Sequence, residues 1–114
     1  MKKLRAIFFK SETGAEPVKA RLLSLSKEER KLIGEDIKTV QLGWPIGMPL
    51  VRSLGSTLWE VRSKLPSSRI ARIIFFMDND AMILLSDFIK KTQKTPTEEI
   101  NLAKKRRKLY ERYI

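Results

Sequence analysis

The chain of 114 residues contains neither cysteine nor histidine. The absence of cysteine excludes disulfides and thiolate chemistry, and it suits a reducing cytoplasm, where we expect the protein to act. The absence of histidine removes the commonest metal ligand and the usual general base near neutral pH. The sequence shows no metal-binding cluster, so we expect no metal and no other cofactor. Any catalysis must therefore use Arg, Lys, Asp, Glu, Tyr, Ser or Thr.

Long apolar runs and Gly-rich loops are absent as well. No run approaches the roughly 20 apolar residues needed to span a bilayer, so we expect no membrane partner. The start of the chain, MKKLRAIFFK, has basic residues before apolar ones. Its apolar part is too short for a signal peptide and is interrupted by Arg5 and Lys10. The five glycines are scattered and form no phosphate-binding loop.

Basic residues dominate what is present. Lys and Arg number 24 against 13 Asp and Glu, which gives a net charge of +11. Such an excess favours a polyanionic partner, namely nucleic acid, an anionic membrane or an acidic protein. Hydrophobic residues make up 42% of the chain, so it should fold, and its length suits one domain over residues 1–114.

The apolar spacing predicts helices in the first half of the chain and at its end. Residues 4–10 suit a strand, and Glu16-Pro17 opens a short helix. Ser26 and Glu29 have capping-box spacing, so residues 27–42 are predicted to form the second arm of a helical hairpin. A second capping box over residues 95–98 begins the last, basic helix, which runs to about Tyr113.

Three further strands are predicted over residues 58–64, 69–77 and 82–89. Short links join them, so an antiparallel meander is the simplest topology. Residues 43–49 are expected to form a loop that either packs over the edge of the core or belongs to a partner-binding surface. The predicted fold class is therefore α+β, with an N-terminal strand and a helical hairpin packed on a small antiparallel sheet, and a basic C-terminal helix.

Charged residues recur on one predicted strand face. Glu60, Arg62 and Lys64 alternate with apolar residues, so the charges project from one side. Arg72 interrupts the apolar run of the next strand and lies on the same face or the opposite one, depending on the register. Arginine suits a phosphate in reaction because its planar fork meets two oxygens and it stays charged. The alternative is a solvated sheet face in which Glu60 pairs with a neighbouring arginine.

The end of the last predicted strand is a second candidate site. It combines the carboxylate of Asp87, the ring of Phe88 and the lysines Lys90 and Lys91. Such a ring can stack on a base while lysines bind the flanking phosphates. Alternatively, Phe88 belongs to the core and the lysines only aid solubility. The basic segment 104–108 of the last helix is less specific, and it suits RNA, an acidic partner or a solvated face.

Several stretches of the chain resemble a known family. They are LWEVR at residues 58–62, RIARIIFF at 69–76 and FIKKTQKTP at 88–96, followed by the helix start EINLA at 99–103. Together they resemble the phage-derived, HigB-like branch of the RelE/ParE toxin superfamily over nearly the whole chain. The resemblance implies a RelE-like fold and the toxin of a type II toxin–antitoxin system. It also implies a cognate antitoxin, often a helix-turn-helix protein.

RelE- and HigB-like toxins cut mRNA on the ribosome, so the resemblance implies a metal-independent endoribonuclease. In that reaction the ribose 2′-hydroxyl attacks the adjacent phosphate and leaves a cyclic phosphate and a free 5′-hydroxyl. Arg72 matches the arginine that holds the scissile phosphate, and Arg62 and Glu60 match the charged strand before it. Asp87 lies where relatives place His or Tyr for proton transfer. The residues assigned to RNA binding are Lys64, Arg69, Phe88, Lys90, Lys91 and Lys94.

The chain departs from this family at its acid and base, because it has no histidine and has Phe88 where relatives have tyrosine. The protons would have to be transferred by Lys90, Lys91, Lys94, Glu60 or Asp87, or the ribosome would have to supply positioning. Two alternatives to the nuclease follow. One is a toxin-fold protein without nuclease activity, such as a ParE-like gyrase inhibitor or a module that only binds antitoxin or RNA. The other is a basic nucleic-acid-binding or regulatory domain that shares the sheet.

Overall fold

The computed structural model describes residues 3–113. Within this range the chain forms three α-helices, five strands and one 3-10 turn, and none of these helices is long and apolar enough to cross a membrane. The predicted α+β class, with a basic helix as the last element, is confirmed. In chain order the elements are β1 (Arg5–Phe8), α1 (Pro17–Ser24), α2 (Lys27–Gly43), β2 (Val51–Gly55), β3 (Leu58–Lys64), η1 (Pro66–Ser68), β4 (Ile70–Asp78), β5 (Ala81–Lys90) and α3 (Thr97–Arg112).

The strands form one sheet in the order β1-β5-β4-β3-β2. The predicted antiparallel meander is confirmed for β3, β4 and β5, and β1 lies parallel to β5. Strand β2, antiparallel to β3, has no counterpart in the sequence prediction. It lacks apolar alternation, since only Val51 of its five residues is buried. An edge strand pairs on one side only and is often short and polar, which explains why its pattern was weak.

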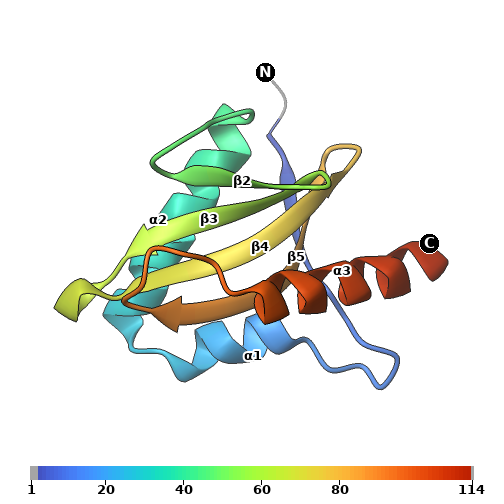
Figure 1. Cartoon of the computed structure of the whole chain (residues 1–114), viewed down its shortest axis with the longest axis horizontal. Coiled ribbons are helices and arrows are strands. Elements are labelled where there is room, and N and C mark those ends of the chain that lie inside the picture. The colour runs from blue at the N-terminus through green and yellow to red at the C-terminus, as the bar shows by residue number, and fades with distance from the viewer. Residues whose placement is uncertain (1–2, 114) are drawn as a thin grey trace.

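Helices α1 and α2 cover one face of the sheet, as predicted, and α2 lies behind the sheet in Figure 1. The capping box of α2 is confirmed, because the N–H of Glu29 donates to Ser26 Oγ at 3.1 Å and the N–H of Ser26 donates to Glu29 Oε1 at 3.3 Å. The apolar stripes of the hairpin are buried in one core with the facing strand residues. From the helices, this core receives Val18, Ile33, Ile37 and Val40.

The loop between α2 and β2 packs over the edge of the core at one end, which is one of the two roles that the sequence left open. Trp44 packs edge-on against Trp59, with ring centroids 5.0 Å apart, and against Phe75 at 5.5 Å. This end of the loop therefore covers the edge of the core. Met48, at the other end, is 63% exposed, so that part of the loop belongs to the surface.

Helix α3 covers part of the opposite face and lies in front of the sheet in Figure 1. Ala103 is buried in the core on this side. The predicted capping box of α3 is wrong, because the helix begins at Thr97 after Pro96 and no side chain caps it. The hydroxyl of Thr95 makes a different bond, described below. Residues 91–96, here named the 91–96 loop, cross another part of this face between β5 and α3 (Figure 1).

Candidate functional site

The strand registers bring four charged residues to the α3 face of the sheet. Arg62 on β3 stands opposite Arg72 on β4, and Arg52 on β2 stands opposite Glu60 on β3. Paired residues project from the same face, and so do residues two apart on one strand. Arg52, Glu60, Arg62 and Arg72, here named the arginine cluster, therefore share one face. Sequence reasoning missed Arg52 because it missed β2, although the Gly55-Ser56-Thr57 sequence before β3 is a turn signal.

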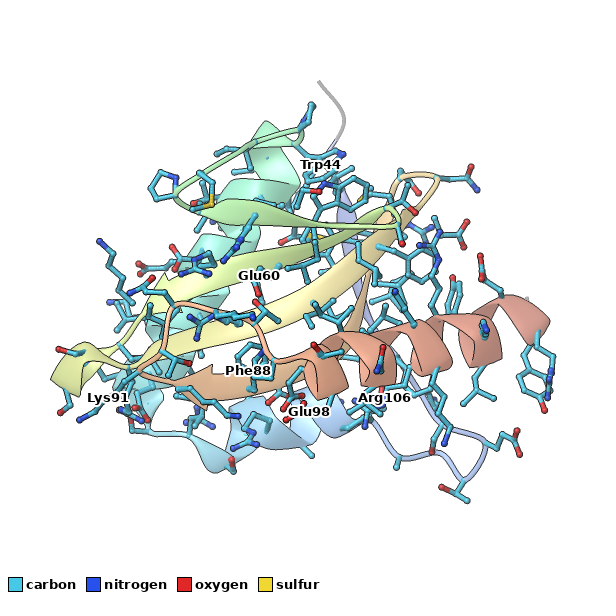
Figure 2. All side chains as sticks on the ribbon, in the orientation of Figure 1. Trp44, Glu60, Phe88, Lys91, Glu98 and Arg106 are labelled. Carbon is cyan, nitrogen blue, oxygen red and sulfur yellow. The ribbon has the colours of Figure 1, made fainter. Side chains whose placement is uncertain are left out.

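Three of the four cluster residues are buried or nearly so, contrary to a solvated sheet face, whereas Arg52 on the edge strand is exposed. Glu60 and Arg72 are 0% exposed, and 9% of the Arg62 side chain is exposed. The 91–96 loop lies over these residues and excludes solvent. In Figure 2, Glu60 and Phe88 lie on the part of the sheet that this loop crosses.

Arg72 is held by backbone carbonyls rather than by an acid. Its Nη2 donates to the carbonyl of Thr92 in the loop, and its Nη1 lies 3.5 Å from the carbonyls of Ile70 and Lys90. Its guanidinium also lies 5.2 Å from the centroid of the Phe88 ring. Its Nε is buried and has no hydrogen-bond partner among residues 3–113. An unpartnered buried donor is rare in proteins, and here it marks a position where an acceptor would be bound favourably.

The other cluster residues are tied to the same loop. Arg62 donates to Glu60 Oε2 at 2.8 Å and to the side-chain oxygen of Gln93 at 2.9 Å. Arg52 donates to the main-chain carbonyl of Gln93 at 3.3 Å. The Thr95 hydroxyl donates to Glu60 Oε1 at 2.6 Å. The loop thus offers neutral oxygens to the arginines and a hydroxyl to the carboxylate.

The cluster holds three arginines and one carboxylate, so positive charge is in excess. Burial lowers the pKa of Arg72, and the neighbouring Arg62 lowers it further, whereas Glu60 opposes both effects. An arginine nevertheless stays protonated in proteins. The lowered pKa therefore reports that the guanidinium lies where an anion would stabilise it.

An open cleft adjoins this cluster at Arg62. Two adjoining depressions of about 310 and 260 Å³ share Pro49, Arg62 and Lys64 in their walls. The second is also lined by Met48, Ile70 and Gln93. Arg62 therefore connects the cleft to the cluster, and Lys64 is exposed in the wall of the cleft.

Asp87, a predicted catalytic residue, is not brought to the cluster. It pairs with Ile73 and projects toward α1, where Arg21 lies 2.8 Å from its carboxylate. Burial raises the pKa of Asp87, and Arg21 opposes that rise. The residue therefore serves the contact between α1 and β5.

The predicted RNA-binding residues separate into two groups. Phe88 is 3% exposed and stands opposite Arg72, so its ring is not free to stack on a base. Arg69 donates to the carbonyl of Pro66 and to the carboxylate of Glu29, which ties β4 to α2. The second group of predicted RNA-binding residues is exposed around the cleft and the loop. It comprises Lys64, Lys90, Lys91 and Lys94.

The comparison with protein families covers most of the chain. Residues 20–108 match the family described as phage-derived protein Gp49-like (DUF891). This range contains the whole arginine cluster, the 91–96 loop and most of α3. No curated protein matches the chain. The chain therefore belongs to the Gp49-like family of phage-derived proteins.

Proposed function

We propose that the chain is the toxin of a type II toxin–antitoxin system and that it cleaves mRNA on the ribosome. The observation that carries this proposal is the excess of positive charge in the arginine cluster, with Nε of Arg72 left without an acceptor. Such a site attracts a ligand with several anionic oxygens, and a phosphodiester in reaction is one. The phage-derived family and an α+β fold compatible with RelE-like toxins support the same proposal.

Substrate binding requires displacement of the 91–96 loop, because Arg72 is fully buried. The oxygens that the loop offers to the arginines are neutral carbonyls of Thr92 and Gln93. Hydrogen bonds to an ionised oxygen are roughly twice as strong as those to a neutral one. A phosphate therefore exchanges favourably for these carbonyls, and it enters at Arg62, which lines the cleft.

The bound phosphate is then placed for attack by the neighbouring 2′-hydroxyl. The P–O bond to the 5′-oxygen of the next nucleotide breaks, and the arginines stabilise the charge that develops on the phosphate oxygens. Displacing the loop moves Thr95 away from Glu60 Oε1, which frees that oxygen to accept the 2′-hydroxyl proton. Lys90, exposed on the same face two residues beyond Phe88, supplies a proton to the leaving 5′-oxygen.

The second candidate function is binding without cleavage. The complete burial of Arg72 and Glu60 favours it, as does Phe88 at the position of the expected tyrosine. Such a protein would be a ParE-like gyrase inhibitor, or a module that binds antitoxin or RNA. With either function we propose a cognate antitoxin, expected to be a helix-turn-helix protein.

Induced expression in a bacterium, with mapping of mRNA 5′ ends at the onset of growth arrest, tests the proposal. We expect new 5′ ends within reading frames for the parent and none for Arg72→Met. Arrest without new ends would favour a binding-only toxin. A folded protein that causes no arrest in a host without the antitoxin would exclude a toxin.

A further inference from the structure

A second basic hollow lies away from the arginine cluster, where α3 passes the turn between β2 and β3. Its volume is about 410 Å³, larger than either depression at Arg62. The walls come from the turn and from one side of α3. They include Ser56, Thr57, Lys104, Arg107, Lys108 and Glu111, and we name this hollow the α3 groove.

Arg107 is fixed at the base of the α3 groove. Its guanidinium lies 4.4 Å from the centroid of the Phe76 ring. Its Nη1 donates to the carbonyl of Ser56 at 2.9 Å and to Thr57 Oγ1 at 2.8 Å, and its Nε lies 3.7 Å from the carboxylate of Glu111. A quarter of the Arg107 side chain remains exposed. The groove therefore has a charged floor that is held in place before any ligand binds.

The turn that forms the other wall is also fixed. Ser56 and Thr57 have φ angles of 54° and 56°, in the left-handed region that β-branched residues in particular avoid. Positive φ at both central residues is the usual conformation of a two-residue type I′ hairpin turn, and Ser56 and Thr57 are the two residues that join β2 to β3. The hydrogen bonds from Arg107 to Ser56 and Thr57 tie this turn to α3.

The open side of the groove carries unneutralised positive charge. Lys104 and Lys108 lie one helical turn apart and are exposed, and neither forms an ion pair within residues 3–113. Glu111, the one acid in the walls, is already engaged by Arg107. A ligand in this groove must therefore bring negative charge.

We propose that the α3 groove binds the phosphate backbone of a single-stranded RNA, next to the part of the strand that enters the arginine cluster. This rests on the proposed function. Strand β2 joins the two sites, because Arg52 belongs to the cluster and Ser56 to the groove. They are four positions apart, which is roughly 13 Å at about 3.3 Å per residue. Both sites lie on the α3 face, so one polyanionic strand that runs along β2 contacts both. The evenly spaced phosphates of RNA suit two linked basic sites better than the charges of an acidic peptide do.

Binding to a fully 2′-O-methylated single-stranded RNA tests the proposal, because that strand cannot be cleaved by its own hydroxyls. Affinity is measured by fluorescence anisotropy over a series of salt concentrations for the parent and for the double variant K104Q/K108Q. Each lost phosphate contact should reduce the salt slope by about 0.7. Two lost contacts should therefore make the salt slope of the double variant smaller by about 1.4. If parent and variant bind equally near 1 M salt, the variant should bind about 25-fold more weakly near 0.1 M.

The matched control is K27Q/K31Q, which removes two exposed lysines at the same spacing on α2, behind the sheet. It should retain more of the affinity and the parent's slope, and K104R/K108R should bind like the parent. Equal losses in K104Q/K108Q and K27Q/K31Q would overturn the proposal. The proposal is also overturned if K104Q/K108Q binds RNA with the parent's affinity but binds poly-glutamate more weakly than the parent does. That result would assign the groove to an acidic protein.

Failure of this proposal and failure of the nuclease are distinguishable. If Arg72→Met abolishes cleavage but K104Q/K108Q binds RNA like the parent, the groove proposal is overturned and the nuclease stands. If no cleavage occurs at all but K104Q/K108Q alone loses affinity and slope, the groove is an RNA site on a protein that binds without cutting.

Discussion

Arg62 and Arg72 stand directly opposite each other on β3 and β4, so two guanidinium groups project from paired positions on one face of the sheet. Like charges placed opposite each other across an antiparallel pair destabilise the sheet. Glu60 binds Arg62 at 2.8 Å, and the Thr92 carbonyl accepts from Arg72, which offsets part of this repulsion. The anionic ligand proposed above would offset the remaining repulsion by supplying negative charge.

Replacing Arg72 by methionine removes the repulsion and keeps a buried side chain of similar length. We expect the free energy of unfolding to stay within about 1.5 kcal/mol of the parent, since apolar residues can replace buried charges at little cost. Cleavage of mRNA on ribosomes should fall by about 100- to 1000-fold, as when one oxyanion-stabilising group is lost. Urea unfolding and single-turnover cleavage measure the two effects.

Arg30→Met, at an exposed position of α2, is the matched control and should cleave like the parent. If Arg72→Met is folded and still cleaves at the parent's rate, the scissile phosphate is not held by Arg72.

The 91–96 loop is expected to compete with RNA for the arginine cluster. Gln93→Ala removes the side-chain oxygen that accepts from Arg62 at 2.9 Å, so the loop opens more readily. RNA affinity should rise about 5-fold, which corresponds to a hydrogen bond of roughly 1 kcal/mol. Gln93→Glu adds a charge to the same bond and should weaken RNA binding. Fluorescence anisotropy with the 2′-O-methylated strand measures both.

Gln93→Ala is the variant that decides whether the loop competes with RNA. In Gln93→Glu, the added negative charge alone would also weaken RNA binding. Thr92→Ala is the control within the loop, since Arg72 is bound by the main-chain carbonyl of Thr92 and not by its side chain. A loss of affinity in Gln93→Ala would mean that Gln93 binds RNA rather than competing with it.

Thr95 is expected to stabilise the fold through Glu60 and not through a helix cap. Thr95→Val removes the hydroxyl that donates to the buried carboxylate at 2.6 Å. Leaving that acceptor short of a donor should reduce the free energy of unfolding by about 1 to 3 kcal/mol, whereas Thr95→Ser should retain most of it. Thr97→Val, at the exposed first residue of α3, is the control. Equal losses at both positions in urea unfolding would contradict the role given to Thr95.

The elements with strong periodicity could be predicted from the sequence. Helix α2 combines a capping box with an apolar stripe, and its observed bounds differ from the predicted ones by one residue. Strand β2 could not be predicted, because an edge strand with one buried residue has almost no pattern. The start of α3 was misplaced because Thr95 and Glu98 have capping spacing, and spacing alone does not reveal that a buried carboxylate takes the Thr95 hydroxyl.

The candidate site could be predicted only in part, because register and loop placement are tertiary properties. Alternation showed that Glu60 and Arg62 share a face, but not that Arg72 joins them. The irregularity in β4–β5 pairing is decisive for Asp87. The pair Phe75 and Leu84, continued without a shift, would set Asp87 opposite Arg72. The one-residue shift between Ile74 and Phe75 turns Asp87 to the other face, and no sequence signal marks it.

Asp87 provides a test of that register through pH. Burial raises its pKa in the folded protein above the ordinary value of about 3.9. The folded state therefore binds this proton more readily than the unfolded chain, so the contribution of Asp87 to stability grows as pH falls toward the unfolded value and is lost as pH rises through the folded pKa. The free energy of unfolding of the parent minus that of Asp87→Asn should become more positive between about pH 7 and pH 4, measured by urea unfolding. Glu35→Gln, at an exposed position of α2, is the charge-matched control.

Because the Asp87 carboxylate lies away from the arginine cluster, beside Arg21, Asp87→Asn should also cleave mRNA like the parent. A difference that shrinks on acidification would mean that Arg21 governs this carboxylate more than burial does, and a loss of cleavage in a folded variant would return Asp87 to the site.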